Sequence, residues 1–221
     1  VCNNELYFTA DGGTNGYELW KYDGTNAPSM VADINPSGPS YPTHFAVFNN
    51  EFYFSATDGT HGNELWKYDG TNAPSMVADI YPGSVGDAPE DMIVFNGKMY
   101  FEATNAGSGD ELWVYDGVNA PSMVADINFG SGSSYPTQFA VFNNELYFQA
   151  SDGTNGNELW KYDGVNALSM VMDINPFSSS NLAYLTVFNN ELYFRAEDGT
   201  NAFELWVTSG SELSHTEVTY S

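Results

Sequence analysis

The tripeptide Glu-Leu-Trp occurs five times at a nearly constant interval, and this repeat constrains the fold more than any other feature of the sequence. The five tryptophans, separated by 46, 47, 47 and 46 residues, are Trp20, Trp66, Trp113, Trp160 and Trp206. A period of this size is typical of propellers, solenoids and repeat arrays, in which each copy is one supersecondary unit. The chain is therefore expected to consist of five copies of one small structural unit.

Each copy contains four short apolar segments that are typical of β-strands. In the second copy and its lead-in they are THFAVF (43–48), NNEFYFSA (49–56), NELWKYDG (63–70) and PSMVADI (74–80). Such runs, bounded by Gly, Asn, Asp or Pro, indicate strands. Four strands in a repeat of about 47 residues match the blade of a propeller. The sequence predicts an all-β fold, a β-propeller of four-stranded antiparallel blades, with five blades favoured over a larger ring.

The links between these segments predict which strands are neighbours and which loops share a face. Asn49-Asn50 separates the first two strands and favours a two-residue type I′ hairpin. Only the link from the fourth strand to the next first strand is long, as in NPSGPSYPT (35–43), and it reads as the crossover between blades. The hairpins between strands two and three then share a face with the crossovers. We call this the lower face, and variable loops make it the expected place for a ligand.

The repeats divide the chain, as a single propeller domain of residues 1–221, at approximately 1–48, 49–95, 96–142, 143–188 and 189–221. Val1-Cys2 corresponds to the end of a first strand, so most of that strand is missing from the first copy. The last copy is expected to place its fourth strand near Val218 to Ser221. A five-bladed ring would therefore need its missing inner strand from another segment, and the alternative is a larger ring of which this chain is a part.

The charge balance excludes several classes of partner. Acidic residues outnumber basic ones 29 to 5, which gives a formal net charge of −24. Such a surface repels phosphate backbones and anionic lipid headgroups. The sequence also lacks a long apolar run of the kind that would indicate membrane insertion. Cys2 is the only cysteine, so an internal disulfide and a cysteine zinc site are both excluded. Neutral sugars, divalent cations and basic proteins remain compatible partners.

The octapeptides around the tryptophans resemble the bacterial ELWxxDGT-repeat family. ELWKYDGT occurs twice, ELWVYDGV and ELWKYDGV are close variants, and the fifth copy, ELWVTSGS, keeps only the first half. The resemblance covers almost the whole chain and implies a secreted or surface-attached protein with propeller-like repeats, without a defined activity. In repeat number and length the chain is also similar to the tachylectin type of five-bladed sugar-binding propeller, by architecture alone.

The hairpins between strands two and three carry the first set of candidate site residues. In four copies the hairpin starts with Asp-Gly, at Asp11, Asp58, Asp152 and Asp198. Carboxylates and free carbonyls around a tight turn are the oxygen ligands that calcium prefers, so these four are candidate Ca²⁺ ligands. They are also candidates for direct ligand contact. The structural alternative is that each Asp bonds to its own backbone while Gly supplies a positive φ.

Strand three and the crossovers carry the second set. A glutamate precedes Leu-Trp in every copy, at Glu18, Glu64, Glu111, Glu158 and Glu204, and is expected either to bond to the backbone of the adjacent crossover or to contact a ligand. The tryptophans are expected in the core between blades, with sugar stacking as the alternative. The crossovers vary most between copies, and their aromatic residues, Tyr41, Tyr135, Phe177 and Tyr184, are candidate sugar contacts.

The sequence contains no constellation typical of an enzyme. The three histidines, His44, His61 and His215, fall at unrelated positions of the repeat, and the acidic group Asp87, Glu90 and Asp91 belongs to a single crossover. Nearly identical copies favour several equivalent binding sites. We therefore expect a non-enzymatic, secreted or cell-surface module that binds carbohydrate multivalently, with glycans or extracellular surface proteins as partners and Ca²⁺ as an optional ion. The alternative is a structural or protein-adhesion scaffold within a larger extracellular protein.

Overall fold

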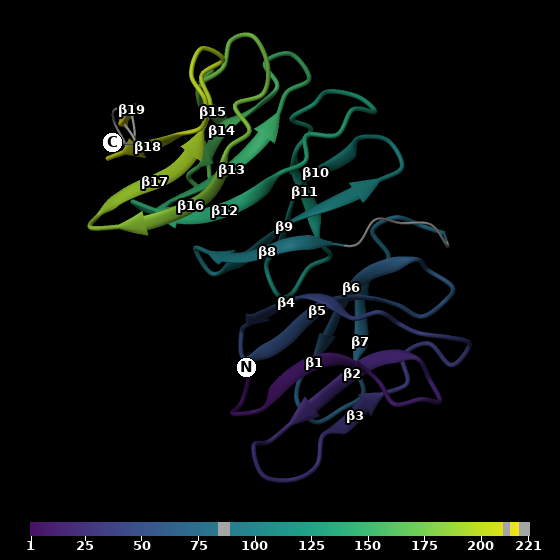
Figure 1. The fold of residues 1–221 in the computed structure, drawn as a ribbon. Coiled ribbons are helices and arrows are strands. Elements are labelled where there is room, and N and C mark those ends of the chain that lie inside the picture. Colours follow the sequence, from purple (N-terminus) through teal and green to yellow (C-terminus); the bar gives the residue numbers. More distant parts are fainter. Residues whose placement is uncertain (84–88, 210–212, 217–221) are drawn as a thin grey trace. The chain divides into compact units, whose positions relative to one another are not determined.

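The computed structural model describes residues 1–83, 89–209 and 213–216, and these residues form strands, turns and loops without a helix (Figure 1). They build five antiparallel sheets, one for each repeat. Because the described part of the chain is free of helices, it also contains none that is long and apolar enough to span a membrane.

In every sheet the strands follow one another in chain order. The first sheet contains β1 (Leu6–Asp11), β2 (Tyr17–Tyr22) and β3 (Ser29–Ala32). The second contains β4 (Thr43–Phe48), β5 (Glu51–Thr57), β6 (Asn63–Tyr68) and β7 (Ser75–Ala78). The third contains β8 (Glu90–Phe95), β9 (Lys98–Asn105), β10 (Gly109–Tyr115) and β11 (Ser122–Ala125). The fourth contains β12 (Thr137–Phe142), β13 (Glu145–Ser151), β14 (Asn157–Tyr162) and β15 (Ser169–Met172). The fifth contains β16 (Ala183–Phe188), β17 (Glu191–Ala196), β18 (Glu204–Thr208) and β19 (Leu213–Thr216).

The two ends of the repeat array differ from the complete copies. In the first sheet only Cys2 and Glu5 form an isolated bridge, at the position where Phe48 pairs with Glu51 in the second sheet. The missing first strand is thus confirmed. In the last copy the expected position of the fourth strand was wrong: β19 lies at 213–216, and Val218 to Ser221 lie outside the described residues. The strand comes early because only residues 209–212 separate it from β18, whereas 163–168 separate β14 from β15.

The short turns between first and second strands have the geometry that their sequence predicts. Asn49 and Asn50 have φ values of 48° and 64°, and the Asn pairs of the fourth and fifth copies also have positive φ. Positive φ at both central residues is the requirement of a type I′ turn, whose twist matches that of the flanking strands. Asparagine is tolerated in this region because its side chain bonds locally.

The described chain forms two compact units. The first comprises Val1–Val94, Lys98–Ala106 and Trp113–Ser122, and the second comprises Phe95–Gly97, Gly107–Leu112 and Met123–Ser221.

Each unit has its own core, and the repeated tryptophan contributes to both. In the first unit Trp66 is buried and packs in one cluster with Ile34 and the partly buried Val31 of the preceding repeat. In the second unit Trp206 is buried in a cluster that includes Ile174 of the preceding repeat. The tryptophans of the second and fifth copies therefore fill space between consecutive sheets, as the core interpretation predicts, whereas Trp20 and Trp160 are only partly buried.

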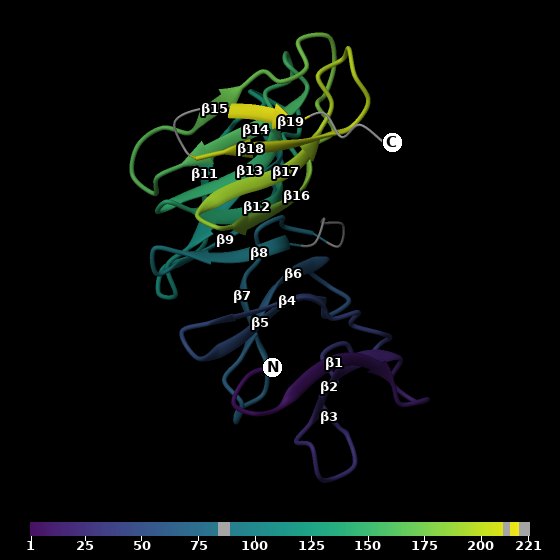
Figure 2. The same ribbon diagram turned by 60° about the vertical axis from the view of Figure 1, so that its left-hand side comes forward.

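Consecutive sheets of the second unit pack side by side. Strands β12 and β16 are in contact, and the backbone N–H of Tyr184 donates to Oε1 of Gln138 at 2.7 Å. Figure 2 shows β12 and β16 next to each other, and β16 to β19 following in chain order. First strands that lie next to each other in neighbouring sheets are the arrangement of adjacent propeller blades.

Candidate functional site

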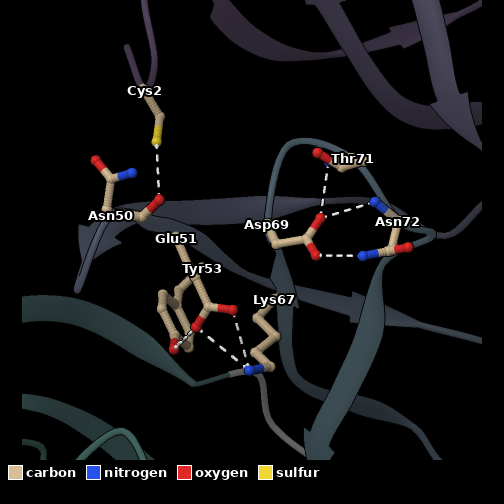
Figure 3. A network of polar contacts seen from close by, with 8 residues as sticks. All are labelled: Cys2, Asn50, Glu51, Tyr53, Lys67, Asp69, Thr71 and Asn72. Carbon is tan, nitrogen blue, oxygen red and sulfur yellow. Dashed lines mark hydrogen bonds and ion pairs between the residues drawn. The ribbon is translucent and has the colours of Figure 1, made fainter.

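The upper face of the first unit, opposite the crossovers, consists of turns that stabilise themselves (Figure 3). Asp69 Oδ1 accepts hydrogen bonds from the backbone N–H groups of Thr71 and Asn72, both at 2.8 Å. Beside this turn Lys67 Nζ lies 3.1 Å from Glu51 Oε1. The same Asp turn recurs at Asp23, Asp116 and Asp163. These hydrogen bonds are internal to the turns.

On the lower face, the aspartates of the strand two to strand three hairpins stabilise their own turns. Asp58 Oδ1 accepts hydrogen bonds from the backbone N–H groups of Thr60 and His61 at 2.8 and 3.0 Å. Asp152 and Asp198 do the same, and Asp11 accepts one from Gly13. The third copy, which has Asn105 in place of Asp, lacks this carboxylate. The turn-forming interpretation accounts for all four aspartates.

The hairpin aspartates belong to four different sheets, so each carboxylate faces its own loop. Within residues 1–83, 89–209 and 213–216, no three His, Cys, Asp or Glu side chains form a group that could hold a metal ion. Calcium binding at these turns therefore stays a prediction that a chelator experiment must test.

The glutamates of strand three hold the crossovers. Glu18 is fully buried, and its carboxylate accepts hydrogen bonds from the backbone N–H groups of Ile34, at 3.1 Å, and Ser40, at 2.9 Å. The bond to the residue after strand four recurs in three further copies, from Ile80 to Glu64, from Ile127 to Glu111 and from Ile174 to Glu158. The geometry thus gives these carboxylates the backbone-bonding role that was one of the two sequence interpretations.

Burial changes the ionisation of these glutamates. It raises the pKa of Glu64 and of Glu158 to about 7, and it also raises the pKa of Glu111. The hydrogen bonds from the crossover oppose this effect because they stabilise the charged form. Glu204 is 7% exposed, and its Oε2 has no partner among the described residues. By its distance in sequence, the residue that would donate its backbone N–H to Glu204, as Ile174 does to Glu158, is Tyr220, which lies outside the described residues.

A serine in the crossover, which the sequence interpretation missed, links consecutive sheets. Ser40 donates through its N–H and Oγ to Glu18 of the first sheet, and its carbonyl accepts the N–H of Thr57 at the end of β5 in the second. Ser134 and Ser180 make the same carbonyl bond, to the N–H groups of Ser151 and Glu197. We call Ser40, Ser134 and Ser180 the crossover serines. A signal was available, since a serine directly precedes Tyr-Pro in two crossovers.

Tyr41 and Tyr135, the candidate sugar contacts, lie exposed on the crossovers, with 54% and 53% of their surface accessible. Their φ values are 47° and 49°, which are strained for a bulky residue and cost on the order of 1–3 kcal/mol each. Tyr41 stacks on Tyr17 of the adjacent hairpin, with ring centres 5.9 Å apart and planes inclined by 24°. In the third copy, Asp110 occupies the hairpin position that Tyr17 has in the first copy, so Tyr135 faces no equivalent ring. The stacked pair is therefore a feature of the first copy.

The same hairpin and crossover form a polar cavity of about 320 Å³ in the first unit, although neither tyrosine lines it. It is formed by the hairpin residues 14–16, by Asp33 and by the crossover residues 35–39. Gly16 makes the hairpin and crossover fit together, because a Cβ atom there would lie 2.9 Å from Pro39. We call this cavity, together with Tyr17 and Tyr41, the tyrosine pocket.

The fourth crossover presents a second aromatic group, in the second unit. Phe177 and Tyr184 are 79% and 70% exposed. Arg195, the only arginine of the chain, has its guanidinium carbon 4.1 Å from the ring centre of Phe203 and 5.2 Å from that of Tyr184. Sequence reasoning missed Arg195, although a lone arginine in so acidic a chain was a usable signal.

The acidic group of the second crossover is described only in part. Glu90 and Asp91 are exposed at the start of β8, and Glu90 Oε2 lies 3.9 Å from His44 Nε2. Asp87 lies outside the described residues.

No protein-family model matches the sequence, and a search of curated proteins gives no match. Solved structures do resemble the fold over 96% of this chain. One is the β-propeller domain of the Trilobed protease from Pyrococcus furiosus, with a TM-score of 0.54, 11% identity and 80% of that chain covered. Another is TolB from Acinetobacter baumannii, with a TM-score of 0.55, 12% identity and 52% of that chain covered.

A third similar structure comes from a study of two prolyl endopeptidases, with a TM-score of 0.61 and 7% identity. The chain spans about a third of the length of that protein, since 33% of it is covered. At these identities the likeness concerns the fold and not the activity. Together with the five repeated sheets, it shows that the described chain has the fold of a β-propeller.

Proposed function

We propose that this chain is a carbohydrate-binding module, secreted or displayed at the cell surface, which binds glycans through the loops of its lower face. The observation that carries the proposal is the tyrosine pocket, in which one hairpin and one crossover carry two stacked, half-exposed aromatic rings and also form a polar cavity. The resemblance of the repeats to the ELWxxDGT family supports the extracellular setting.

The composition of the pocket matches the surface of a sugar. A pyranose has an apolar face and a rim of hydroxyl groups that both donate and accept hydrogen bonds. Tyr17 and Tyr41 offer apolar ring faces with a polar hydroxyl end. Asn15 and Asp33 offer an amide and a carboxylate, which already bond to each other across the cavity. A few polar groups placed beside apolar walls are the usual composition of a small-molecule site.

The pocket is organised before any ligand arrives. The backbone N–H groups of Ser40 and Tyr41 both donate to the carbonyl of Tyr17 at 3.1 Å, and Pro42 restricts the chain after Tyr41. A ring held in place loses little freedom on binding, so more of the contact energy appears as affinity. The strained backbone of Tyr41 is consistent with such a role, since strained residues cluster at ligand sites.

The repeat extends the proposal to the whole chain. The hairpin and the crossover recur along the chain, and the crossovers carry aromatic side chains, with Tyr-Pro in the first and third and with Phe177 and Tyr184 in the fourth. Several weak sites on one chain would bind a branched or polymeric glycan with high avidity. The proposal requires no bond making or breaking, so the chain acts as a binder and not as an enzyme.

Replacing Tyr41 by glycine tests the proposal without damaging the backbone. Tyr41→Gly removes the stacked ring and also relieves the positive φ, so the midpoint of thermal unfolding is expected to stay equal or rise. A glycan array identifies the preferred sugar, and calorimetry then measures its affinity. We expect about a tenfold loss at this site, which corresponds to roughly 1–1.5 kcal/mol of aromatic contact.

Tyr135→Gly is the matched control, because Tyr135 has the same backbone strain without a stacked partner. It is expected to change the affinity less than Tyr41→Gly does. An array without any sugar hit, in calcium and in chelator, would contradict the proposal and leave the protein-adhesion scaffold as the better account. A hit that chelator abolishes would assign calcium to the hairpins.

A further inference from the structure

A groove of about 460 Å³ lies within the second unit, between strand four of the third sheet and the fourth sheet. One side is formed by residues 124–127, at the end of β11. The other is formed by Trp160 and Tyr162 of β14 and by residues 165–168 of the following turn. We call it the interblade groove. Its volume lies within the usual range for small-molecule sites, about 300–1,000 Å³.

The groove is lined by polar and apolar groups, and one of its apolar residues, Leu168, occurs only in the fourth copy. Leu168 stands where three other copies have a proline, at Pro28, Pro74 and Pro121. Val165, which is 84% exposed, extends the apolar wall toward solvent. Together with Trp160 and Tyr162 these residues form a surface on which an alkyl chain can lie.

Asp126 gives the groove an acceptor without a donor. Its Oδ2 accepts a hydrogen bond from the backbone N–H of Gly130 at 3.1 Å, but its buried Oδ1 has no hydrogen-bond partner in the described chain. An unsatisfied buried acceptor costs about 1–3 kcal/mol, so a donor at this position would be stabilising. The lining residues include no lysine, arginine or histidine that could supply it.

The neighbouring carboxylate does not compensate Asp126. Glu111 accepts hydrogen bonds from Ile127 and from the hydroxyl of Ser134, and its negative charge adds to that of Asp126. The chain as a whole carries a formal charge of −24. Local and overall charge therefore both favour a cation in the groove.

We propose that the interblade groove binds an alkylammonium group, with the ammonium donating to Asp126 and the alkyl stem lying along Trp160, Tyr162 and Leu168. Aromatic rings attract such cations through their faces, and the attraction grows when water is excluded. The group can be a free amine or the end of a lysine side chain of a partner protein, since both present the same chemistry. This site lies in the other unit from the tyrosine pocket, so the inference is independent of sugar binding.

The test measures binding of N-acetyl-lysine methylamide to the full chain by calorimetry at low salt. The neutral analogue N-acetyl-norleucine methylamide has the same apolar stem without the ammonium. A charge-assisted hydrogen bond is worth about 1.5–3 kcal/mol, so we expect the norleucine compound to bind about ten to a hundred times more weakly. Asp126→Asn is expected to cause a loss of the same size, and affinity for the cation should fall as salt rises.

Asp79→Asn is the matched control, because Asp79 occupies the same place in the second repeat but lies exposed, outside this groove. Leu168→Pro gives a second variant that restores the residue of three other copies, and it is expected to weaken binding without unfolding the chain. Equal affinity for the two compounds, absence of binding by the lysine compound, or equal effects of Asp126→Asn and Asp79→Asn would each overturn the proposal.

An n-butylammonium titration distinguishes the two sources of the cation. Binding as tight as that of the lysine compound indicates a free amine as ligand, and weaker binding indicates a lysine on a peptide. Both results support the ammonium site, whereas failure of the glycan array would not affect it.

Discussion

At the scale of single residues, the carboxylates of this chain ionise in two opposite ways, because their positions in the repeat differ. Those in exposed turns accept hydrogen bonds that stabilise the charged form, and bonds from Asn119 and Val118 lower the pKa of Asp116 to about 2. Those of strand three are buried, and desolvation raises the pKa of Glu64 and Glu158 to about 7. The position of a carboxylate in the repeat therefore decides whether its pKa is lowered or raised.

The buried glutamates make stability depend on pH near neutrality. Their folded-state pKa lies above the ordinary value of 4.5, so between pH 4.5 and 7 the folded chain binds more protons than the unfolded chain. Stability therefore falls as the pH rises through this window. We expect the free energy of unfolding to be higher at pH 5 than at pH 8, by on the order of 2–3 kcal/mol for each of the two groups.

Urea denaturation at several pH values measures this slope. The double variant Glu64→Gln/Glu158→Gln should have a flatter curve across the same window, since amides do not titrate there. An unchanged slope in the double variant would assign the pH dependence to other groups.

At the scale of elements, the crossover is the part of the repeat that needs the most specific contacts. It is long and rich in Pro, Gly and Ser, and it is held by a glutamate of strand three and by a crossover serine. The serine reaches strand three of one sheet and strand two of the next, so it fixes the loop and joins two sheets at once.

Ser40→Ala tests the contribution of one such serine. It removes the Oγ bond to the buried carboxylate of Glu18 and leaves the backbone bonds of Ser40 in place. A buried acceptor that loses one donor costs about 1–3 kcal/mol of stability. Thermal or urea unfolding of Ser40→Ala should show this loss, whereas Ser37→Ala, an exposed serine of the same crossover, should stay within about 0.5 kcal/mol of the parent chain. Equal effects of the two variants would rule out the linking role.

Strands and short turns could be predicted from the sequence, whereas the loops could not. Alternating apolar residues, Asn-Asn pairs and Asp-Gly turns act through neighbours in the chain, and the strands other than β19 lie where these signals place them. The stack of Tyr17 on Tyr41 depends on a positive φ that no tyrosine favours by itself. The interblade groove depends on which sheets adjoin, which is tertiary information.

At the scale of the whole molecule, the dominant quantity is the charge. The chain carries 29 acidic and 5 basic residues. Lys21, Lys67 and Lys161 each pair with a glutamate of their own sheet, so these three neutralise charge only locally. Most of the negative charge therefore remains uncompensated and opposes compaction through self-repulsion.

Salt is therefore expected to stabilise the chain. At 0.15 M ionic strength charges more than about 8 Å apart are largely screened, so the midpoint of thermal unfolding should rise by several degrees from about 10 mM to 150 mM sodium chloride. Magnesium and calcium chloride at equal ionic strength complete the test. If calcium raises the midpoint well beyond magnesium, a specific calcium site is present in addition to screening. A midpoint that does not respond to any salt would contradict the expectation.

The crossover serines also bear on how such a chain can change its length. Each accepts and donates across a junction whose two sides come from consecutive repeats, and the same bonds recur at three junctions. A duplicated repeat would bring its own crossover serine at one end and its own strand two at the other. Each of these groups would find its hydrogen-bond partner in the adjacent repeat. None of these three junctions limits the number of copies, so a gene of this kind can gain or lose a repeat there while the hydrogen bonds of the junction are kept.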